Sequence, residues 1–374
     1  MKKTVHIVCF DVPYPVDHGG FFDLFYKIKA LHEQGIAIIL HCFQYGRDQQ
    51  DILSHYCKDV FYYERFTGLK SFSFKLPYIV KSRINKKLFN NLSADHFPII
   101  LEGTHCTYWL YKNLLSQRKI IYRLHNIEHI YYKQLFYTEK NFLKKLYYLW
   151  ESLLLKNYER KAALQASVVL PVSENDVVKF KHFCPKANIQ YVPVFLPYQK
   201  VETKEGSGNY CLYHGNLSVA ENEQVAIWLV KNVSEKINLS LIIAGRQPSH
   251  HLTRIVQQYK NVQLIADPAD EEMQRLIQNA HINLIFSFNA TGIKLKLINA
   301  LFNGRHCLVN TAAVIGTDLE QYCHKAESAK QVQEVVNQLQ YRAFEIQEIQ
   351  KREKAILALF NNQLNAQKLS AWLY

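Results

Sequence analysis

The sequence predicts an α/β protein built from two domains of similar design. Three observations indicate this: a length of 374 residues, a recurring alternation of short apolar runs with stretches of helical spacing, and one polar linker after which the alternation restarts. Strands that alternate with helices form parallel sheets with helices on both faces. We therefore expect two doubly wound sheets.

The first half of the chain is expected to form one of these domains. Apolar runs rich in β-branched residues predict its strands, and helical spacing fills the segments between them. Ser173, followed by Asp176, is typical of a helix start after a buried strand. The expected strands are 4–10, 36–43, 60–63, 98–102, 119–124, 167–171 and 189–193, and the expected helices are 21–34, 107–116, 140–166 and 174–183.

A second α/β unit follows the linker VETKEGSGN, which is the most polar and glycine-rich stretch of the chain. The boundary is placed near residues 195–208, and residues 364–374 are expected to form an amphipathic helix. The expected strands of the second unit are 210–214, 239–244, 261–265, 281–287 and 306–310.

The composition is that of a globular protein, with 48% hydrophobic and 21% charged residues. No apolar run approaches the roughly 18–20 residues of a spanning helix, so we expect a cytoplasmic protein. The eight cysteines are scattered without paired spacing, and the sixteen histidines show no ligand spacing. Free buried thiols and no bound metal are the expectation.

The net charge of +13 is concentrated in two aromatic-rich stretches. Between Arg65 and Lys87 there are seven basic residues and no acidic one, and a second basic stretch covers 131–161. Such surfaces suit anionic lipid headgroups, which predicts a peripheral position at the inner face of the cell membrane. A solvated basic face is the alternative. Because no nucleic-acid-binding motif accompanies the charge, no nucleic acid partner is expected.

Three polar loops are expected at the carboxyl ends of strands, where parallel sheets bind ligands. Residues 13–20 follow the first strand and end in Gly19 and Gly20, which let a phosphate or sugar approach backbone N–H groups closely. Residues 125–128 and 290–296 follow two further strands. Together the loops favour a catalytic cleft, although a plain tight turn also fits residues 13–20.

The segment HINLIFSFNATGIKLKLINALFNGRHCLVN, residues 281–310, carries the strongest signal. It predicts a buried strand, a turn at Thr291 and Gly292, a helix over 293–302 and another strand. A helix N-terminus offers unpaired N–H groups and a positive dipole end, to which Lys294 and Lys296 add full charges. We expect a phosphate or diphosphate to bind here; lysines that only face water are the alternative.

The motif RLHNIE supplies a polar group at or beyond the end of another strand. It would contact sugar hydroxyls or relay protons near neutral pH through its histidine, unless it is only a hydrogen-bonded structural loop. Its polar residues are Arg123, His125, Asn126 and Glu128. Weaker candidates for contact with a phosphate in the second domain are Gly215, Asn216 and Arg246.

These pieces together resemble the GT-B glycosyltransferases, specifically family 4 of the nucleotide-sugar-dependent retaining enzymes. The resemblance covers nearly the whole chain and rests on the order and spacing of PYPVDHGG, RLHNIE, VSENDVVKF, YHGNLSVAEN, LIIAG, ATGIKLKLINALFNGR and NAQKLSAWL. It implies two Rossmann-like domains with sheets facing across a cleft, residues 1–197 holding mainly the acceptor and 208–359 mainly the donor. It also implies a final helix, 360–374, that crosses back to the first domain, and no metal or cofactor besides the nucleotide-diphosphate sugar.

The sequence departs from this family around the diphosphate loop. Family members usually carry two glutamates eight positions apart, for the donor sugar and the ribose, and these positions hold Thr291 and Asn299 here. Asn299 would bind a ribose without charge assistance and therefore less strongly. Some relatives keep a GIxxK turn, which this sequence matches. The loop residues expected at the donor are Thr291, Gly292, Ile293 and Asn299.

The resemblance implies transfer of a hexose, with retention of configuration, to a glycan or lipid-linked acceptor in the synthesis of a cell-surface polysaccharide or glycoconjugate. Lys294 and Lys296 would stabilise the charge that develops on the departing diphosphate, and His125 would position the sugar. Because both glutamates are missing, a GT-B-like protein that binds a nucleotide sugar or glycan without turnover is the alternative.

Overall fold

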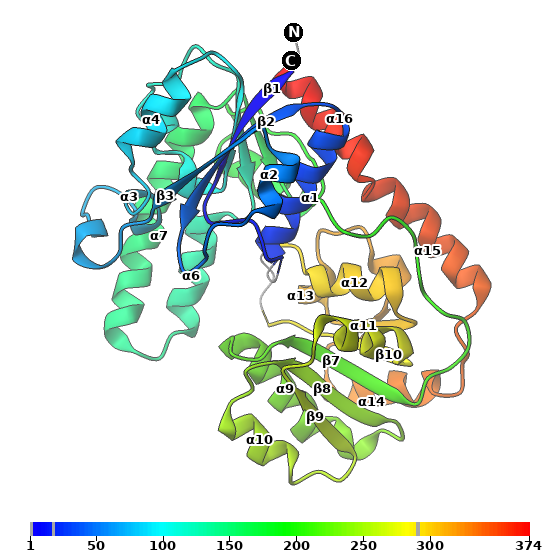
Figure 1. Cartoon of the computed structure of the whole chain (residues 1–374). Helices are drawn as coiled ribbons and strands as arrows, with labels where there is room; N and C mark the ends of the chain where they lie inside the picture. The colour runs from blue at the N-terminus through cyan, green and yellow to red at the C-terminus, as the bar shows by residue number, and fades with distance from the viewer. Residues whose placement is uncertain (1–2, 17–18, 289–291) are drawn as a thin grey trace. The chain divides into compact units, whose positions relative to one another are not determined.

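The computed structural model describes residues 3–16, 19–288 and 292–374, and the chain divides into two compact units (Figure 1). Unit 1 comprises Met1–Pro197 with Phe360–Tyr374, and unit 2 comprises Tyr198–Leu359. Each unit contains one six-stranded parallel sheet flanked by helices, which confirms the predicted α/β class.

The sheet of unit 1 has the strand order β3-β2-β1-β4-β5-β6. Every residue of β1, β4, β5 and β6 is buried, because helices cover both faces, and this is why these strands read as continuous apolar runs. The strands are β1 (Thr4–Cys9), β2 (Ala37–Gln44), β3 (Asp59–Glu64), β4 (Ile99–Glu102), β5 (Ile120–Leu124) and β6 (Val168–Pro171). The helices are α1 (Gly19–Glu33), α2 (Ile52–Tyr56), α3 (Tyr78–Lys81), α4 (Lys86–Ser93), α5 (Tyr108–Tyr111), α6 (Glu128–Thr138), α7 (Phe142–Gln165), α8 (Glu174–Phe183) and α16 (Asn362–Leu373).

The sheet of unit 2 repeats this topology with the order β12-β11-β10-β7-β8-β9. Its strands are β7 (Tyr210–Asn216), β8 (Ser240–Arg246), β9 (Val262–Ala266), β10 (Ile282–Ile285), β11 (His306–Val309) and β12 (His324–Lys325). Its helices are α9 (Ala220–Asn232), α10 (His250–Val256), α11 (Asp270–Asn279), α12 (Leu295–Asn303), α13 (Thr311–Val314), α14 (Ala329–Leu339) and α15 (Ile346–Leu359).

Both sheets reverse their strand order at one internal point. The reversal falls between β1 and β4 in unit 1, and between β7 and β10 in unit 2. Open α/β sheets bind their ligands beyond the carboxyl ends of the strands at this point. The loops that follow these four strands are therefore where a ligand is expected.

The C-terminal helix α16 belongs to unit 1 although α15 before it belongs to unit 2. Ala366, Leu369 and Leu373 lie in the same buried cluster as α1 and β1. Tyr374 Oη donates to Thr4 O at 2.8 Å, and Asn362 Nδ2 donates to Leu196 O at 2.6 Å. Among the described residues, no helix combines the length and the apolar character that crossing a bilayer requires.

The structure differs from the prediction at several places. Residues 189–193 form only one isolated bridge, from Ile189 to Val169, instead of a strand. The helix expected over 107–116 is reduced to α5, and Asn113 beyond it has a positive φ of 57°. Helix α6 was not predicted; it pairs with α7 as an antiparallel hairpin.

Candidate functional site

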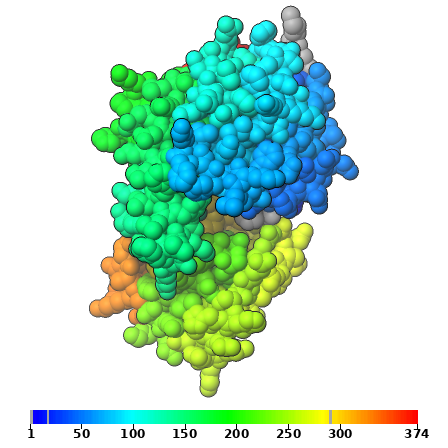
Figure 2. All heavy atoms as spheres, turned by 90° about the vertical axis from the view of Figure 1, so that its left-hand side faces the viewer, coloured from blue at the N-terminus to red at the C-terminus, as the bar shows by residue number. Residues whose placement is uncertain are grey.

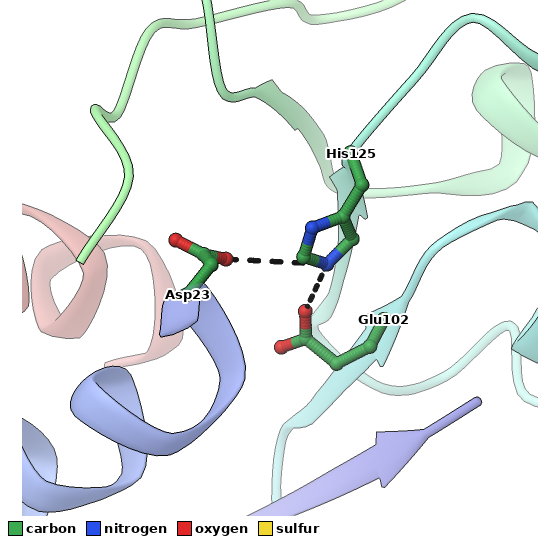
Figure 3. Close-up of side chains that lie close together, drawn as sticks. All are labelled: Asp23, Glu102 and His125. Atoms are coloured by element: carbon green, nitrogen blue, oxygen red, sulfur yellow. Dashed lines mark hydrogen bonds and ion pairs between the residues drawn. The ribbon is translucent and has the colours of Figure 1, made fainter. Parts of the chain in front are cut away.

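Charged side chains gather at the carboxyl edge of the unit 1 sheet, beside the strand reversal (Figure 3). Asp23 and Lys27 come from α1, Glu102 ends β4, and Arg123 and His125 lie at the end of β5. Four of these side chains are at most 1% exposed, and that of His125 is 11% exposed. Such burial of charge requires close pairing.

Asp23 is the centre of this cluster. Arg123 donates to it through two nitrogens, Nη2 to Oδ1 at 2.7 Å and Nε to Oδ2 at 3.0 Å, and Lys27 Nζ donates to Oδ2 at 2.8 Å. Burial by itself would raise the pKa of Asp23, but the charges of Arg123 and Lys27 hold the pKa well below its ordinary value. Asp23 is therefore ionised at neutral pH.

Glu102 orients His125. His125 Nε2 lies 2.8 Å from Glu102 Oε2 and 3.9 Å from Asp23 Oδ2 (Figure 3). Burial alone would raise the pKa of Glu102, but Lys27 and the hydrogen bond with His125 lower it. An ionised carboxylate only accepts, so Nε2 carries the hydrogen and, in the neutral ring, Nδ1 is left as an acceptor. Nδ1 makes no hydrogen bond to a described residue, which leaves it available to a hydroxyl group.

The oxygens of Asp23 and Glu102 and a nitrogen of His125 lie within 4.8 Å of one another, a spacing that metal sites share. A cation already occupies this position. Lys27 Nζ lies 2.8 Å from Asp23 Oδ2 and 2.8 Å from Glu102 Oε1, the latter as an ion pair without hydrogen-bond geometry. Because Arg123 also neutralises Asp23, the set fits an internal ion-pair network better than a divalent metal.

Arg123, which was expected to contact a sugar, has no exposed surface. Besides Asp23, its guanidinium donates to Val192 O at 2.6 Å and to Pro193 O at 2.9 Å. Direct contact with a substrate is excluded in this arrangement, because every donor nitrogen of Arg123 faces the interior. Arg123 instead fixes Asp23 and the 192–195 segment relative to β5.

Glu128, the first residue of α6, is a buried acid with a raised pKa. Burial and the neighbouring Glu159 raise the pKa of Glu128 to about 8, although the charge of Arg83 and a hydrogen bond from the half-buried Asn126 act in the opposite direction. Glu159, on α7, accepts from Glu128 N at 2.9 Å and from His129 N at 3.2 Å, and its Oε2 lies 2.6 Å from His129 Nδ1. Glu128 is therefore protonated at neutral pH and able to donate a hydrogen bond.

Gly19 and Gly20 form the first residues of α1, so they lie one turn before Asp23. A Cβ on Gly20 would lie 3.1 Å from Phe10 Cζ, so this glycine allows the helix to approach the end of β1. Phe10 in turn stands edge-on to His125, with ring centroids 5.7 Å apart. Gly19 is exposed at the helix start.

In unit 2, Lys296 lies at the carboxyl ends of β7 and β10. Its Nζ donates to Phe286 O at 3.0 Å and to Tyr213 Oη at 3.4 Å, and it stands 4.6 Å from the Tyr213 ring centroid. Burial, aided by Lys294 and opposed by Glu221, lowers the pKa of Lys296 to about 8. A lysine in this state is mostly charged at pH 7 and has little water around it.

The predicted turn and helix around Lys296 are present. Gly292 has φ +63°, a conformation that favours glycine, and α12 begins at Leu295 with Lys294 as its N-cap residue. Helix α12 therefore begins two residues later than predicted. Ile293 is half-buried, and Thr291 lies outside the described residues.

His214 and Glu221 lie close to Lys296 and were not singled out from the sequence. His214 Nε2 is buried without a hydrogen-bond partner among the described residues, and burial together with Lys296 lowers the pKa of His214 to about 3. Glu221, in the first turn of α9, accepts from Ser287 Oγ at 2.6 Å. A buried polar atom that the protein leaves unsatisfied is one that a ligand can satisfy.

The loop after β7 is held by its own contacts. Asn216 Oδ1 accepts from Ser218 N at 3.1 Å and from Ser218 Oγ at 2.7 Å, which closes a local turn. Gly215 pairs with Gly245, and a Cβ on Gly245 would lie 1.8 Å from Gly215 O. The two strands therefore need glycine at this point in order to approach each other.

Arg246 and Asn299 already interact with neighbouring side chains. Arg246 Nη2 lies 3.3 Å from Asp270 Oδ1 in an exposed ion pair. Asn299 Oδ1 accepts from Asn303 Nδ2 at 2.8 Å, and Asn299 Nδ2 lies 3.4 Å from Gln274 Oε1. Of the unit 2 candidates, Lys294 and Lys296 interact electrostatically, since the charge of Lys294 contributes to the lowered pKa of Lys296.

Comparisons with known proteins bear on the fold. No protein-family model matches the chain. It is 28% identical over 323 residues, 81% of each chain, to a Klebsiella pneumoniae protein described as an uncharacterized 44.6 kDa protein in the cps region.

Several solved structures match along the whole chain. HepE of Anabaena, solved with UDP and glucose, has a TM-score of 0.67 at 11% identity and covers 98% of each chain. TarM of S. aureus, solved as a point mutant with fondaparinux, α-GlcNAc-glycerol and UDP, has a TM-score of 0.67 at 10% identity over all of both chains. UGT89C1 of Arabidopsis thaliana, solved with UDP-L-rhamnose, has a TM-score of 0.59 at 14% identity and covers 100% of this chain and 99% of its own. At identities this low, the structural matches are evidence for the fold alone. They confirm that the chain has the GT-B fold.

Proposed function

We propose that the chain is a glycosyltransferase that transfers a hexose from a UDP-sugar to a hydroxyl of a glycan or lipid-linked acceptor. The observation that carries this proposal is the cluster at the strand reversal of unit 2. There, Lys296 and the N-terminus of α12 follow the end of β10, and the unsatisfied Nε2 of His214 comes from the neighbouring strand β7. UDP is the donor nucleotide we infer, because HepE, TarM and UGT89C1 were solved with UDP or a UDP-sugar.

The chemical demand of the reaction matches this cluster. Breaking the bond between the anomeric carbon and the diphosphate oxygen leaves negative charge on the diphosphate, while the acceptor oxygen bonds to the same carbon. Lys296, supported by Lys294 and the α12 N-terminus, would stabilise that charge where it develops. The acceptor's proton passes to the departing phosphate oxygen, so no protein base is required.

In unit 1 we propose that His125 binds a sugar hydroxyl through Nδ1. Glu102 holds the opposite ring nitrogen, and the ion pairs of Lys27 and Asp23 hold Glu102. The protonated Glu128 is a second hydrogen-bond donor next to this loop. Retention of the anomeric configuration, membership in family 4 and a place in cell-surface polysaccharide or glycoconjugate synthesis extend the proposal from the sequence motifs.

A second candidate function is nucleotide-sugar or glycan binding without turnover. It is favoured by the Asn299 carboxamide, which is engaged with Asn303 and Gln274 and carries no charge for a ribose. A binding protein of this kind would be stabilised by the nucleotide but would release none from a donor sugar.

A two-stage experiment tests the proposal. Thermal unfolding of the full chain with UDP, GDP, ADP, CMP and dTDP identifies the base, since a ligand at 100 times its Kd stabilises by about 2.7 kcal/mol. UDP release from UDP-hexoses is then measured with glycan and lipid-linked acceptors, for the wild type and for Lys296→Met. No stabilisation by any nucleotide overturns the proposal; stabilisation by UDP without release in any acceptor mixture favours the binding protein.

A further inference from the structure

An exposed apolar stripe runs along α7 on the side that faces away from the sheet of unit 1. Leu143, Leu146, Trp150 and Leu153 follow one another at spacings of three, four and three residues, which places them on one helix face. Their exposed fractions are 75%, 47%, 42% and 53%. The opposite face of α7, which includes Leu155, is buried against the protein, so the exposed stripe is not the face by which α7 packs on unit 1.

The segment 66–74 extends this surface beside α7 (Figure 2). Phe74, which is 73% exposed, packs edge-on against Trp150 with ring centroids 6.3 Å apart. The segment is anchored by Tyr78 N, which donates to Glu151 Oε2 on α7 at 2.9 Å. Ten of the 23 exposed large hydrophobic side chains among the described residues lie in 66–74 and 137–153, less than a tenth of the chain. Concentration on this scale marks an interaction surface.

The charges around the stripe are almost all positive. The acidic residues within the hairpin do not offset them, because Glu151 and Glu159 are buried and only Glu139 lies near the surface. The segment 65–87 contributes no acid at all. The lysines that flank the stripe are Lys70, Lys75, Lys140, Lys144, Lys145 and Lys156.

We propose that the apolar stripe and its flanking lysines dock on an anionic lipid bilayer, with the leucines and Trp150 entering the headgroup region. The positive charge around the stripe favours a lipid surface over a second copy of the chain. A second copy of the chain would bring the same lysines face to face, whereas anionic headgroups attract each of them. Leucines and an indole beside lysines are also the side chains that an interfacial helix uses. This proposal assigns the membrane contact expected from the sequence to a defined set of residues. It does not depend on the proposed transferase activity.

The test is co-sedimentation of the full chain with phosphatidylcholine vesicles and with vesicles containing about 30% phosphatidylglycerol. We expect binding to the anionic vesicles that weakens with salt, because charge screening at about 0.15 M extends only about 8 Å. Leu143→Gln/Leu153→Gln should lower the binding constant at least about tenfold. Leu114→Gln is the matched control for position 153, since Leu114 is 54% exposed and lies outside the stripe.

A second variant tests the charge. Lys144→Gln/Lys145→Gln should lower the binding constant for anionic vesicles about fivefold per lysine, as roughly 1 kcal/mol per lysine implies. Its binding constant for neutral vesicles should stay unchanged. Circular dichroism checks that each variant is folded. Equal binding to both vesicle types, or unchanged binding of both variants, overturns the proposal. So does a dimer in light scattering that Leu153→Gln dissociates without lipid, because the stripe would then be a protein interface.

Discussion

The pKa of Lys296 makes the proposed donor site testable by pH alone. With a pKa of about 8, the ammonium is roughly 90% protonated at pH 7 and roughly 10% at pH 9. A diphosphate attracts only the protonated form, so raising the pH from 7 to 9 should weaken UDP binding by up to about tenfold, or about 1.4 kcal/mol. The terminal phosphate of UDP does not cause this loss, because it ionises near pH 6 and its negative charge only increases between pH 7 and 9.

Isothermal titration of UDP at pH 7, 8 and 9 measures this effect. Since the bound diphosphate stabilises the charged lysine, proton uptake should accompany binding near pH 8 and appear as a dependence of the heat on the buffer. Lys296→Met removes the charge and keeps the chain length, so its UDP affinity should be weak and independent of pH. Lys294→Gln is the comparison, because it should weaken binding but retain the pH dependence, shifted upward as the neighbouring charge is removed.

Two outcomes would refute this reasoning. Wild-type binding that stays constant from pH 7 to 9, while Lys296→Met is weak, would mean that the lysine contacts the diphosphate with an ordinary pKa. Unchanged binding in Lys296→Met would remove Lys296 from the site. In that second case the Phe286 and Tyr213 contacts of its ammonium group would have to be purely structural.

Three further predictions concern the remaining site residues. In the folded chain Glu128 keeps a proton that it loses near pH 4.5 in the unfolded chain, so at pH 7 folding must take up this proton. Glu128→Gln should therefore raise the free energy of unfolding by about 3 kcal/mol at pH 7 but not at pH 4.5, as urea unfolding midpoints at the two pH values would show. Arg123→Met leaves the buried Asp23 carboxylate with fewer partners and should cost about 3–5 kcal/mol in the same assay; a loss below about 1 kcal/mol would contradict the network. Gly245→Ala brings a Cβ to 1.8 Å from Gly215 O and should abolish cooperative unfolding of unit 2 in circular dichroism, whereas Gly215→Ala meets only Asn222 at 3.4 Å and should be tolerated.

The central strands of both sheets, such as β1, β4, β5, β10 and β11, were predictable because they are buried on both faces and so have continuous apolar sequences. The two-residue edge strand β12 is not buried in this way and was not predicted. Helix α8 was predicted with the same bounds that the structure shows, because Ser173 caps it locally, accepting from Asp176 N at 3.1 Å. Helix α6 could not be predicted from the local sequence in the same way. Its first turn is held by Glu159, which lies 31 residues further along the chain, and within α6 only Glu128 and His129 are buried.

The predicted strand at 189–193 failed for a related reason. The carbonyl groups of Val192 and Pro193 accept from the guanidinium of Arg123 instead of from a neighbouring strand. An apolar, β-branched sequence therefore satisfied its backbone with a buried side chain. No local pattern in the sequence distinguishes these two ways of pairing.

The candidate site likewise contains residues that local motifs predict and residues that only contacts between distant elements bring together. Gly292, Lys296 and His125 belong to contiguous motifs, so the sequence could single them out as candidates. The partners of His125 come from other elements, and only the pair Asp23 and Lys27, four residues apart within the mostly apolar run 21–28 of α1, gave a signal that could have been used. The two carboxylates of the network were therefore found only in the structure.

Stability alone does not account for this buried network. Two carboxylates and two cations lose their hydration when they are buried, and an apolar set of similar volume is often at least as stable. What the network does supply is a fixed position for one imidazole. Lys27 holds Glu102, Glu102 holds Nε2 of His125, and Nδ1 is left as the acceptor. An enzyme that must bind a hydroxyl in one orientation requires such a fixed acceptor, whereas a purely structural loop does not. The network is therefore better explained by what it presents at the sheet edge than by what it adds to the core.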